Sequence, residues 1–218
     1  MALDFQAQRV KMVDGQLRTT DVTGHALLAA FLDVPREIFV PQSLADLAYL
    51  DADLQVAPGR FLPEPSPFAK LVALAEVGAA SHVLEIGCGT GYGSAILSKL
   101  AASVVALECD AELASLASAN LKTLGIGNAR VVSGRLEAGH AEAGPYDVII
   151  FSGSVEKVPP LLFAQLKDGG RLVAAEGTPA LGAARLYIKT GDRQASRFAF
   201  NASLKPLPGF APAAEFSL

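Results

Sequence analysis

The chain has 218 residues, of which 51% are hydrophobic and 18% charged, and its formal net charge is −4. This corresponds to about one domain of ordinary size, and it excludes a disordered protein, which would be poor in apolar residues and highly charged. The small acidic excess disfavours a nucleic-acid partner, and two cysteines with three scattered histidines are too few for a disulfide framework or a zinc site, so we expect no metal.

The N-terminus shows no targeting signal. Polar residues from Asp4 onward leave no room for the apolar core of a signal peptide. No stretch of about 18 apolar residues is free of charges, as a membrane-spanning helix would require. We therefore expect a cytoplasmic protein with reduced thiols and no membrane partner.

Short elements are predicted for the first 65 residues. Thr23 is a suitable cap for a helix over residues 24–32, and Pro35 ends it. Residues 53–56 alternate like a short strand. Four prolines between residues 58 and 67 predict an extended or turning loop. Ser66 before Pro67 resembles a helix cap, and a helix should follow to about residue 77.

From residue 82 onward, short apolar runs alternate with helical segments. Strands are predicted at 82–86, 103–108, 130–133, 146–152 and 171–175, and helices at 92–100, 111–124 and 159–166. Continuous apolar runs of this kind are typical of parallel strands covered on both faces. Residues 184–190 and 197–203 alternate and are joined across Gly191 and Asp192, which predicts an antiparallel hairpin.

These elements predict an α/β fold with a doubly wound, mostly parallel sheet, an antiparallel C-terminal edge and a short helical N-terminal extension. We expect a single domain over residues 1–218, with 1–65 as the extension and 66–218 as the core.

A glycine-rich turn follows the first core strand. Gly87, Gly89 and Gly91 lie where this strand passes into a helix, and Glu108 ends the next strand about 20 residues later. A carboxylate there can accept two hydrogen bonds from a ribose diol. The dinucleotide pattern would place its third glycine at position 92, which is Tyr92, so a nicotinamide or flavin enzyme fits poorly. Simple turn glycines and a solvated strand-end charge are the alternative interpretation.

Residues 84–92 together with Glu108 resemble the cofactor motif of class I S-adenosylmethionine-dependent methyltransferases. Further stretches resemble one branch, the protein-L-isoaspartate O-methyltransferase family, and together they cover nearly the whole chain: residues 12–14, 16–18, 34–37, 39–41, 48–51, 83–87, 145–149, 165–167 and 169–173.

The resemblance implies a Rossmann-like methyltransferase that uses S-adenosyl-L-methionine, releases S-adenosyl-L-homocysteine and methylates isoaspartyl carboxylates in damaged proteins, a protein-repair activity. Its partner would be a protein or peptide with an isoaspartyl carboxylate. The extension would lie on the substrate side and the core would bind the cofactor. The implied cofactor-binding residues are Glu85, Gly87, Cys88, Gly89, Gly91, Glu108, Cys109, Arg135 and Leu136.

Three departures from the family pattern affect the implied site. The family's substrate loop reads roughly Gly-Gln-Thr-Ile-Ser-Gln-Pro, and the matching segment here, 59–65, has Pro63 at the serine usually assigned to catalysis. Arg135 replaces an acidic residue, although its planar side chain can stack on adenine. Residues 152–154 read Ser-Gly-Ser instead of a Thr-Ala-Ala-like segment.

Because Pro63 has no hydroxyl, the sequence assigns no catalytic residue. Ser66 is either a substitute hydroxyl or only a helix cap. The alternative function is a divergent cofactor-binding member of the family, with another substrate or little isoaspartyl activity. The sequence does not determine the oligomeric state.

Overall fold

The computed structural model describes residues 3–178 and 181–210. Its helices are α1 (Phe5–Met12), α2 (His25–Asp33), α3 (Pro65–Ala75), α4 (Tyr92–Ser98), α5 (Ala111–Thr123) and α6 (Pro160–Ala164). Its strands are β1 (Leu54–Ala57), β2 (Arg60–Leu62), β3 (His82–Ile86), β4 (Ser103–Glu108), β5 (Ala129–Ser133), β6 (Tyr146–Val155), β7 (Leu166–Thr178), β8 (Leu181–Thr190) and β9 (Arg193–Asn201).

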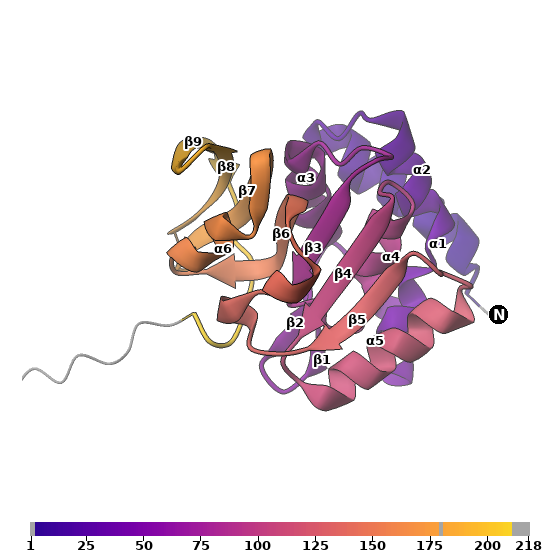
Figure 1. The fold of residues 1–218 in the computed structure, drawn as a ribbon. Coiled ribbons are helices and arrows are strands. Elements are labelled where there is room, and N and C mark those ends of the chain that lie inside the picture. The colour runs from indigo at the N-terminus through magenta and orange to yellow at the C-terminus, as the bar shows by residue number, and fades with distance from the viewer. Residues whose placement is uncertain (1–2, 179–180, 211–218) are drawn as a thin grey trace, which may run out of the picture.

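A seven-stranded sheet forms the frame of the molecule (Figure 1). The strands follow the order β5-β4-β3-β6-β7-β8-β9. The pairings from β5 to β7 are parallel, and β8 and β9 add antiparallel pairings at one edge. The predicted α/β class, the mostly parallel sheet and the antiparallel C-terminal edge are therefore confirmed.

Helices cover both faces of this sheet because the inner strands are apolar on both sides. On one face, Val83, Val104 and Val148 belong to a buried cluster shared with α1 to α4. On the other face, Leu84, Val105 and Ile149 pack in a second cluster with side chains of α6 and of the segment that follows β9. The chain therefore has the three-layer arrangement of a doubly wound fold.

The order of the strands brings two loops together. The chain moves from β3 to β4 on one side, and β6 returns to the other side of β3. Ligands of open α/β sheets bind at the carboxyl ends of the strands near such a reversal. Here the amides of Gly87 and Cys88 donate to the Leu107 carbonyl at 2.9 and 3.1 Å, which attaches the glycine turn to the end of β4.

The N-terminal extension differs from the prediction in three details. The cap of α2 is Gly24 without a side-chain hydrogen bond, so Thr23 does not cap it. Helix α3 begins at Pro65, and the Ser66 hydroxyl donates to Thr20 Oγ1 at 2.8 Å instead of capping. The proline-rich loop contains the short strand β2, which pairs antiparallel with β1. The proline-free stretch from Arg60 to Leu62 leaves backbone amides for this pairing.

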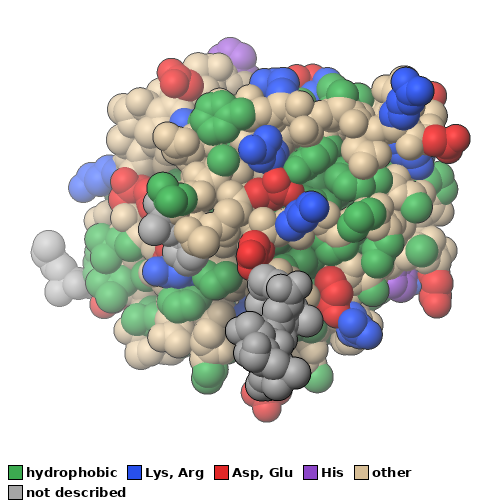
Figure 2. All heavy atoms as spheres, turned by 90° about the vertical axis from the view of Figure 1, so that its left-hand side faces the viewer, with side chains coloured by type: hydrophobic (Ala, Val, Ile, Leu, Met, Phe, Trp, Pro, Cys, Tyr) green, Lys and Arg blue, Asp and Glu red, His purple; other side chains and the backbone are tan. Residues whose placement is uncertain are grey.

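The edge strand β9 is largely exposed, whereas β8 beside it is mostly half-buried. Figure 2 shows charged side chains of both signs among apolar ones on this side of the molecule. Exposed arginines such as Arg193 and Arg197 lie on the edge strand β9, where charge discourages pairing with another chain. Among the described residues, no helix is long and apolar enough to cross a membrane. The division into 1–65 and 66–218 stays a prediction.

Candidate cofactor site

The glycine turn after β3 has a backbone that side chains would disturb. Gly87, Gly89 and Gly91 have φ values of +78°, +56° and +93°, in the left-handed region that favours glycine. A Cβ built on Gly91 would lie 3.2 Å from the Ala117 Cβ of α5. A Cβ built on Gly89 meets no atom of the described residues within 4 Å, which leaves room for a ligand to approach the backbone there.

Glu108, at the end of β4, lies beside this turn. Its Oε2 accepts a hydrogen bond from the Gly89 amide at 2.7 Å, and its Oε1 accepts from the amides of Cys109 and Asp110 at 2.8 and 3.1 Å. Burial alone would raise the pKa of Glu108, but hydrogen bonds and charge from Arg60, with the Asp110 and Gly89 amides, lower it below its ordinary value. Glu108 is therefore a charged acceptor at the end of the strand.

Glu85 is a second buried carboxylate, on β3 just before the glycine turn. It is 0% exposed, and its two oxygens accept hydrogen bonds from the Ser94 hydroxyl of α4 and the Ser152 hydroxyl of β6. Burial raises the pKa of Glu85 to about 7, although the two serine hydrogen bonds oppose this shift. Near neutral pH this group is thus divided between its charged and neutral forms.

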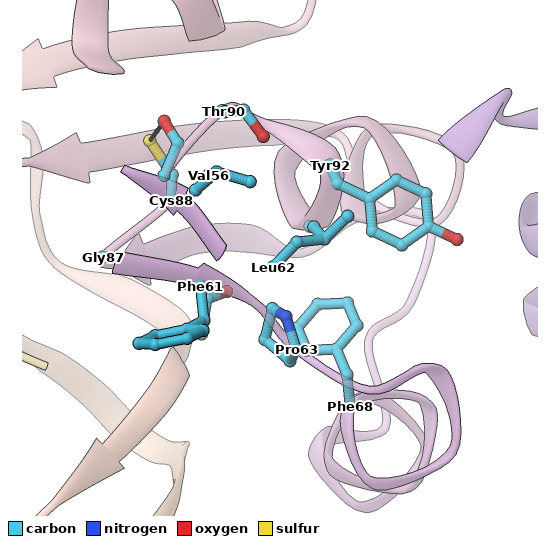
Figure 3. A pocket seen from close by; sticks show the side chains of 12 residues that line it. Val56, Phe61, Leu62, Pro63, Phe68, Gly87, Cys88, Thr90 and Tyr92 are labelled. Atoms are coloured by element: carbon cyan, nitrogen blue, oxygen red, sulfur yellow. Dashed lines mark hydrogen bonds between the residues drawn. The ribbon is translucent and has the colours of Figure 1, made fainter. Parts of the chain in front are cut away.

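The β1–β2 hairpin covers the glycine turn. Figure 3 shows Val56, Phe61 and Leu62 of this hairpin beside Cys88 and Thr90 of the turn. The cavity left between them has a volume of about 10 Å³, which is room for about one water molecule. The hairpin also brings Arg60 onto Glu108: Arg60 Nη1 donates to Oε1, and Nη2 donates to Oε2 at 2.6 Å.

The other residues implied for the cofactor are distributed unevenly. Cys88 lies in the turn and is 5% exposed, and burial raises the pKa of its thiol well above the ordinary value. Cys109 is exposed beside Glu108. Leu136 begins the short helical turn Leu136–Ala138 after β5, and its side chain is buried. The Arg135 side chain is 81% exposed and pairs with Glu137, so it does not line the cavity beside the glycine turn.

Sequence reasoning missed three residues around the loop that carries Pro63. Arg60, at the position where the family loop has glutamine, pairs with Glu108. Arg36 is fully buried and donates to the carbonyls of Ala48 and Pro63 at 2.6 and 2.7 Å. Ser152 lines the same cavity as Pro63. Arg60 and Ser152 lie in segments 59–65 and 152–154, and the departure of these segments from the family pattern was the signal available in the sequence.

The residues present fit S-adenosylmethionine in chemical type. Glu108 supplies the carboxylate that a ribose diol needs, and Gly89 leaves space at the backbone. No group of three or more possible metal ligands occurs in the described parts of the chain.

Comparisons with known proteins agree with this geometry. The family model for protein-L-isoaspartate(D-aspartate) O-methyltransferase matches residues 8–199. A protein-L-isoaspartate O-methyltransferase of Koribacter versatilis is 40% identical over 184 residues, which are 84% of this chain and 82% of that protein. One from Shewanella sediminis is 39% identical over 78% of this chain and 70% of its own length.

Two solved structures share the fold. One named protein-L-isoaspartate O-methyltransferase superposes with a TM-score of 0.80 at 28% identity, covering 92% of this chain and 66% of that longer chain. A Plasmodium falciparum protein assigned to the same type, in complex with S-adenosyl-L-homocysteine, has a TM-score of 0.74 at 18% identity and covers 94% of this chain and 100% of its own. With the match of the family model over most of the sequence, the chain belongs to the protein-L-isoaspartate(D-aspartate) O-methyltransferase family.

Proposed function

We propose that this chain is an S-adenosylmethionine-dependent methyltransferase that esterifies the carboxylate of isoaspartyl residues in proteins or peptides. The observation that supports it most directly is the contact of Gly89 with Glu108, which joins the glycine turn to the strand-end carboxylate. Because the chain belongs to a methyltransferase family, the glycine turn and Glu108 are the groups expected to bind S-adenosylmethionine. The site residues proposed for the cofactor are the glycine turn, Cys88, Glu85, Glu108, Cys109, Leu136 and Arg135, of which Arg135 lies exposed outside the cavity.

Each part of the site has a role that follows from its chemistry. Glu108 would accept the ribose hydroxyls, and the turn around Gly89 would lie against the methionine portion. When bound, S-adenosylmethionine supplies an electrophilic methyl group. The acceptor carboxylate is already a nucleophile, so the chain needs no general base there. Its contribution is to hold the acceptor in line and to exclude water.

Pro63 does not remove every polar group from the acceptor side. Ser152 lies in the same cavity, with its hydroxyl hydrogen-bonded to Glu85. Arg36 fixes the Pro63 carbonyl from below, so the loop has a defined position without the family serine. Because positioning supplies most of the acceleration in such a displacement, we expect methyl transfer to survive the substitution.

The test has two stages. Calorimetry with S-adenosylmethionine and S-adenosylhomocysteine measures cofactor binding. Transfer of labelled methyl groups to an isoaspartyl peptide is then compared with transfer to the same peptide containing ordinary aspartate. Cofactor binding without transfer above the aspartyl control would favour the divergent member of the family over the isoaspartyl enzyme.

A further inference from the structure

A buried ion pair occupies the carboxylate that the ribose needs. Arg60 and Glu108 are joined by two parallel hydrogen bonds, and their side chains are 8% and 0% exposed. A bidentate pair between a guanidinium and a carboxylate is the strongest common form of this contact. The two residues are 48 positions apart and come from the hairpin and the end of β4.

The Glu108 oxygens have no capacity left for a further ligand. A carboxylate offers about four lone-pair sites. Here they receive two bonds from Arg60 and one each from the amides of Gly89, Cys109 and Asp110. Ribose hydroxyls can therefore bind Glu108 only after Arg60 has left it, whereas the three amides can stay.

The small volume beside the glycine turn also requires Arg60 to leave Glu108 before a nucleoside can bind. The cavity between the hairpin and the glycine turn has a volume of about 10 Å³, far too small for a nucleoside. Strands β1 and β2 have four and three residues, and an isolated two-stranded hairpin of this kind is marginally stable at best. The Arg60–Glu108 pair joins this hairpin to the end of β4, beside the buried side chains of Leu54 and Leu62.

Arg60 also lines a second cavity. It also has a volume of about 10 Å³, and its lining includes Arg60, Phe61, Pro63, Ser152 and Lys205. The Lys205 ammonium lies 5.5 Å from the centre of the Phe61 ring. Among the described residues of this lining, the one carboxylate is Asp53, whose Oδ1 accepts a hydrogen bond from the Glu64 amide at 3.0 Å. Two cationic side chains, Arg60 of β2 and Lys205 after β9, therefore line the same cavity as Pro63.

We propose that Arg60 exchanges partners: it holds Glu108 in the free protein and, once the ribose holds Glu108, binds the carboxylate of the methyl acceptor. A buried guanidinium without an anion is strongly unfavourable, so displaced Arg60 favours an acidic ligand beside it. Arg60 thus lowers cofactor affinity and raises acceptor affinity, and the acceptor subsite forms only after cofactor has bound. This inference rests on the proposed function.

Arg60→Gln tests the exchange, because it removes the charge while Glu108 keeps its three amide donors. Arg197→Gln, on exposed strand β9, is the matched control. Calorimetry measures S-adenosylhomocysteine binding, and titration of its complex with an isoaspartyl peptide measures acceptor binding without turnover. Thermal melting confirms that both variants are folded. Arg60→Lys keeps the positive charge but lacks the guanidinium that donates two hydrogen bonds to Glu108. Its affinities for S-adenosylhomocysteine and for the peptide should therefore be intermediate.

We expect Arg60→Gln to bind S-adenosylhomocysteine about tenfold more tightly. This is the gain if the wild-type protein holds the Arg60–Glu108 pair closed about ten times as often as open and the variant has no closed form. Its complex should bind the peptide at least about tenfold more weakly, the loss of one charged hydrogen bond. Arg197→Gln should change neither value. These opposite shifts are not expected from a residue that only supports the fold.

Unchanged or weaker cofactor binding in Arg60→Gln would overturn the exchange, and unchanged peptide binding would overturn the acceptor role. Failure of the proposed function looks different. In that case the wild-type protein fails to bind S-adenosylhomocysteine, which also overturns the exchange, or binds it without distinguishing the isoaspartyl from the aspartyl peptide. In the latter case the cofactor titrations alone decide whether Arg60 competes for Glu108.

Discussion

Glu85 holds a proton more tightly in the folded chain than in the unfolded one. Its pKa rises through burial from 4.5 to about 7, so the native state binds more protons than the unfolded state between these values. Stability then falls as pH rises through this window and is level above it. At about 1.4 kcal/mol for each pKa unit, the effect is on the order of 3 kcal/mol.

We therefore expect Glu85→Gln to remove this pH dependence, because glutamine keeps an oxygen for one serine hydroxyl and has no proton to lose. The measurement is the free energy of unfolding in urea at pH 5, 6, 7 and 8. As pH rises, the free energy of unfolding of the wild type should fall relative to that of the variant. A difference that is constant with pH would show that Glu85 is charged throughout.

Glu108 and Arg60 give a stability experiment at the same scale. Glu108→Ala leaves Arg60 buried without its anion and three amides without their acceptor. Breaking a buried pair in this way costs about 3–5 kcal/mol. Adding Arg60→Gln to that variant should recover part of the loss, measured as a coupling free energy in a double-mutant cycle. Additive losses would contradict the buried pair.

At the scale of elements, helix α4 is packed closely against the Glu85 carboxylate of β3. A Cβ built on Gly93 would fall on Glu85 Oε1 and lie 2.9 Å from Phe68 Cζ. Alanine has the better helix propensity by about 1 kcal/mol, but overpacking of a filled interior costs about 1–3 kcal/mol.

We expect Gly93→Ala to be destabilising by denaturant unfolding. Gly15→Ala is the matched control: Gly15 lies in the helical turn after α1, and a Cβ built there would meet no atom within 4 Å in the described part of the chain. Equal effects of the two substitutions would mean that α4 can move away from Glu85.

The core elements follow from local pattern, which is why the sequence predicts them well. Strands β3 and β4 have the predicted bounds of 82–86 and 103–108, and the turn at Gly191 and Asp192 joins β8 and β9 as expected. Strand β2 was missed because prolines on both sides favour a loop, and its pairing with β1 is a contact that local propensity does not encode.

The site was predictable only in part. The glycine turn and Glu108 belong to one short segment of sequence, and the β3–β4 pairing brings them together. The contacts of Arg60 with Glu108 and of Ser152 with Glu85 join residues 48 and 67 positions apart. Such contacts depend on how the hairpin and β6 pack against the rest of the fold, so a local sequence pattern does not predict them.

At the scale of the whole molecule, cofactor binding should stabilise the fold. A ligand that binds only the native state at about 100 times its dissociation constant adds about 2.7 kcal/mol to the free energy of unfolding. For a chain of this length, this corresponds to a rise in melting temperature of about 5–11 °C. We expect this shift with S-adenosylhomocysteine in a thermal melt, and adenosine diphosphate at the same concentration should give none. An equal shift with both ligands would indicate a general nucleotide site.

The proposed function requires methyl transfer by a chain that has Pro63 in place of the family serine. The decisive measurement is single-turnover transfer from S-adenosylmethionine with a labelled methyl group to an isoaspartyl peptide, with the aspartyl peptide of the same sequence beside it. We expect base-labile label on the isoaspartyl peptide and none above background on the control. Bound cofactor with no label on either peptide, or with equal label on both, would contradict the assignment.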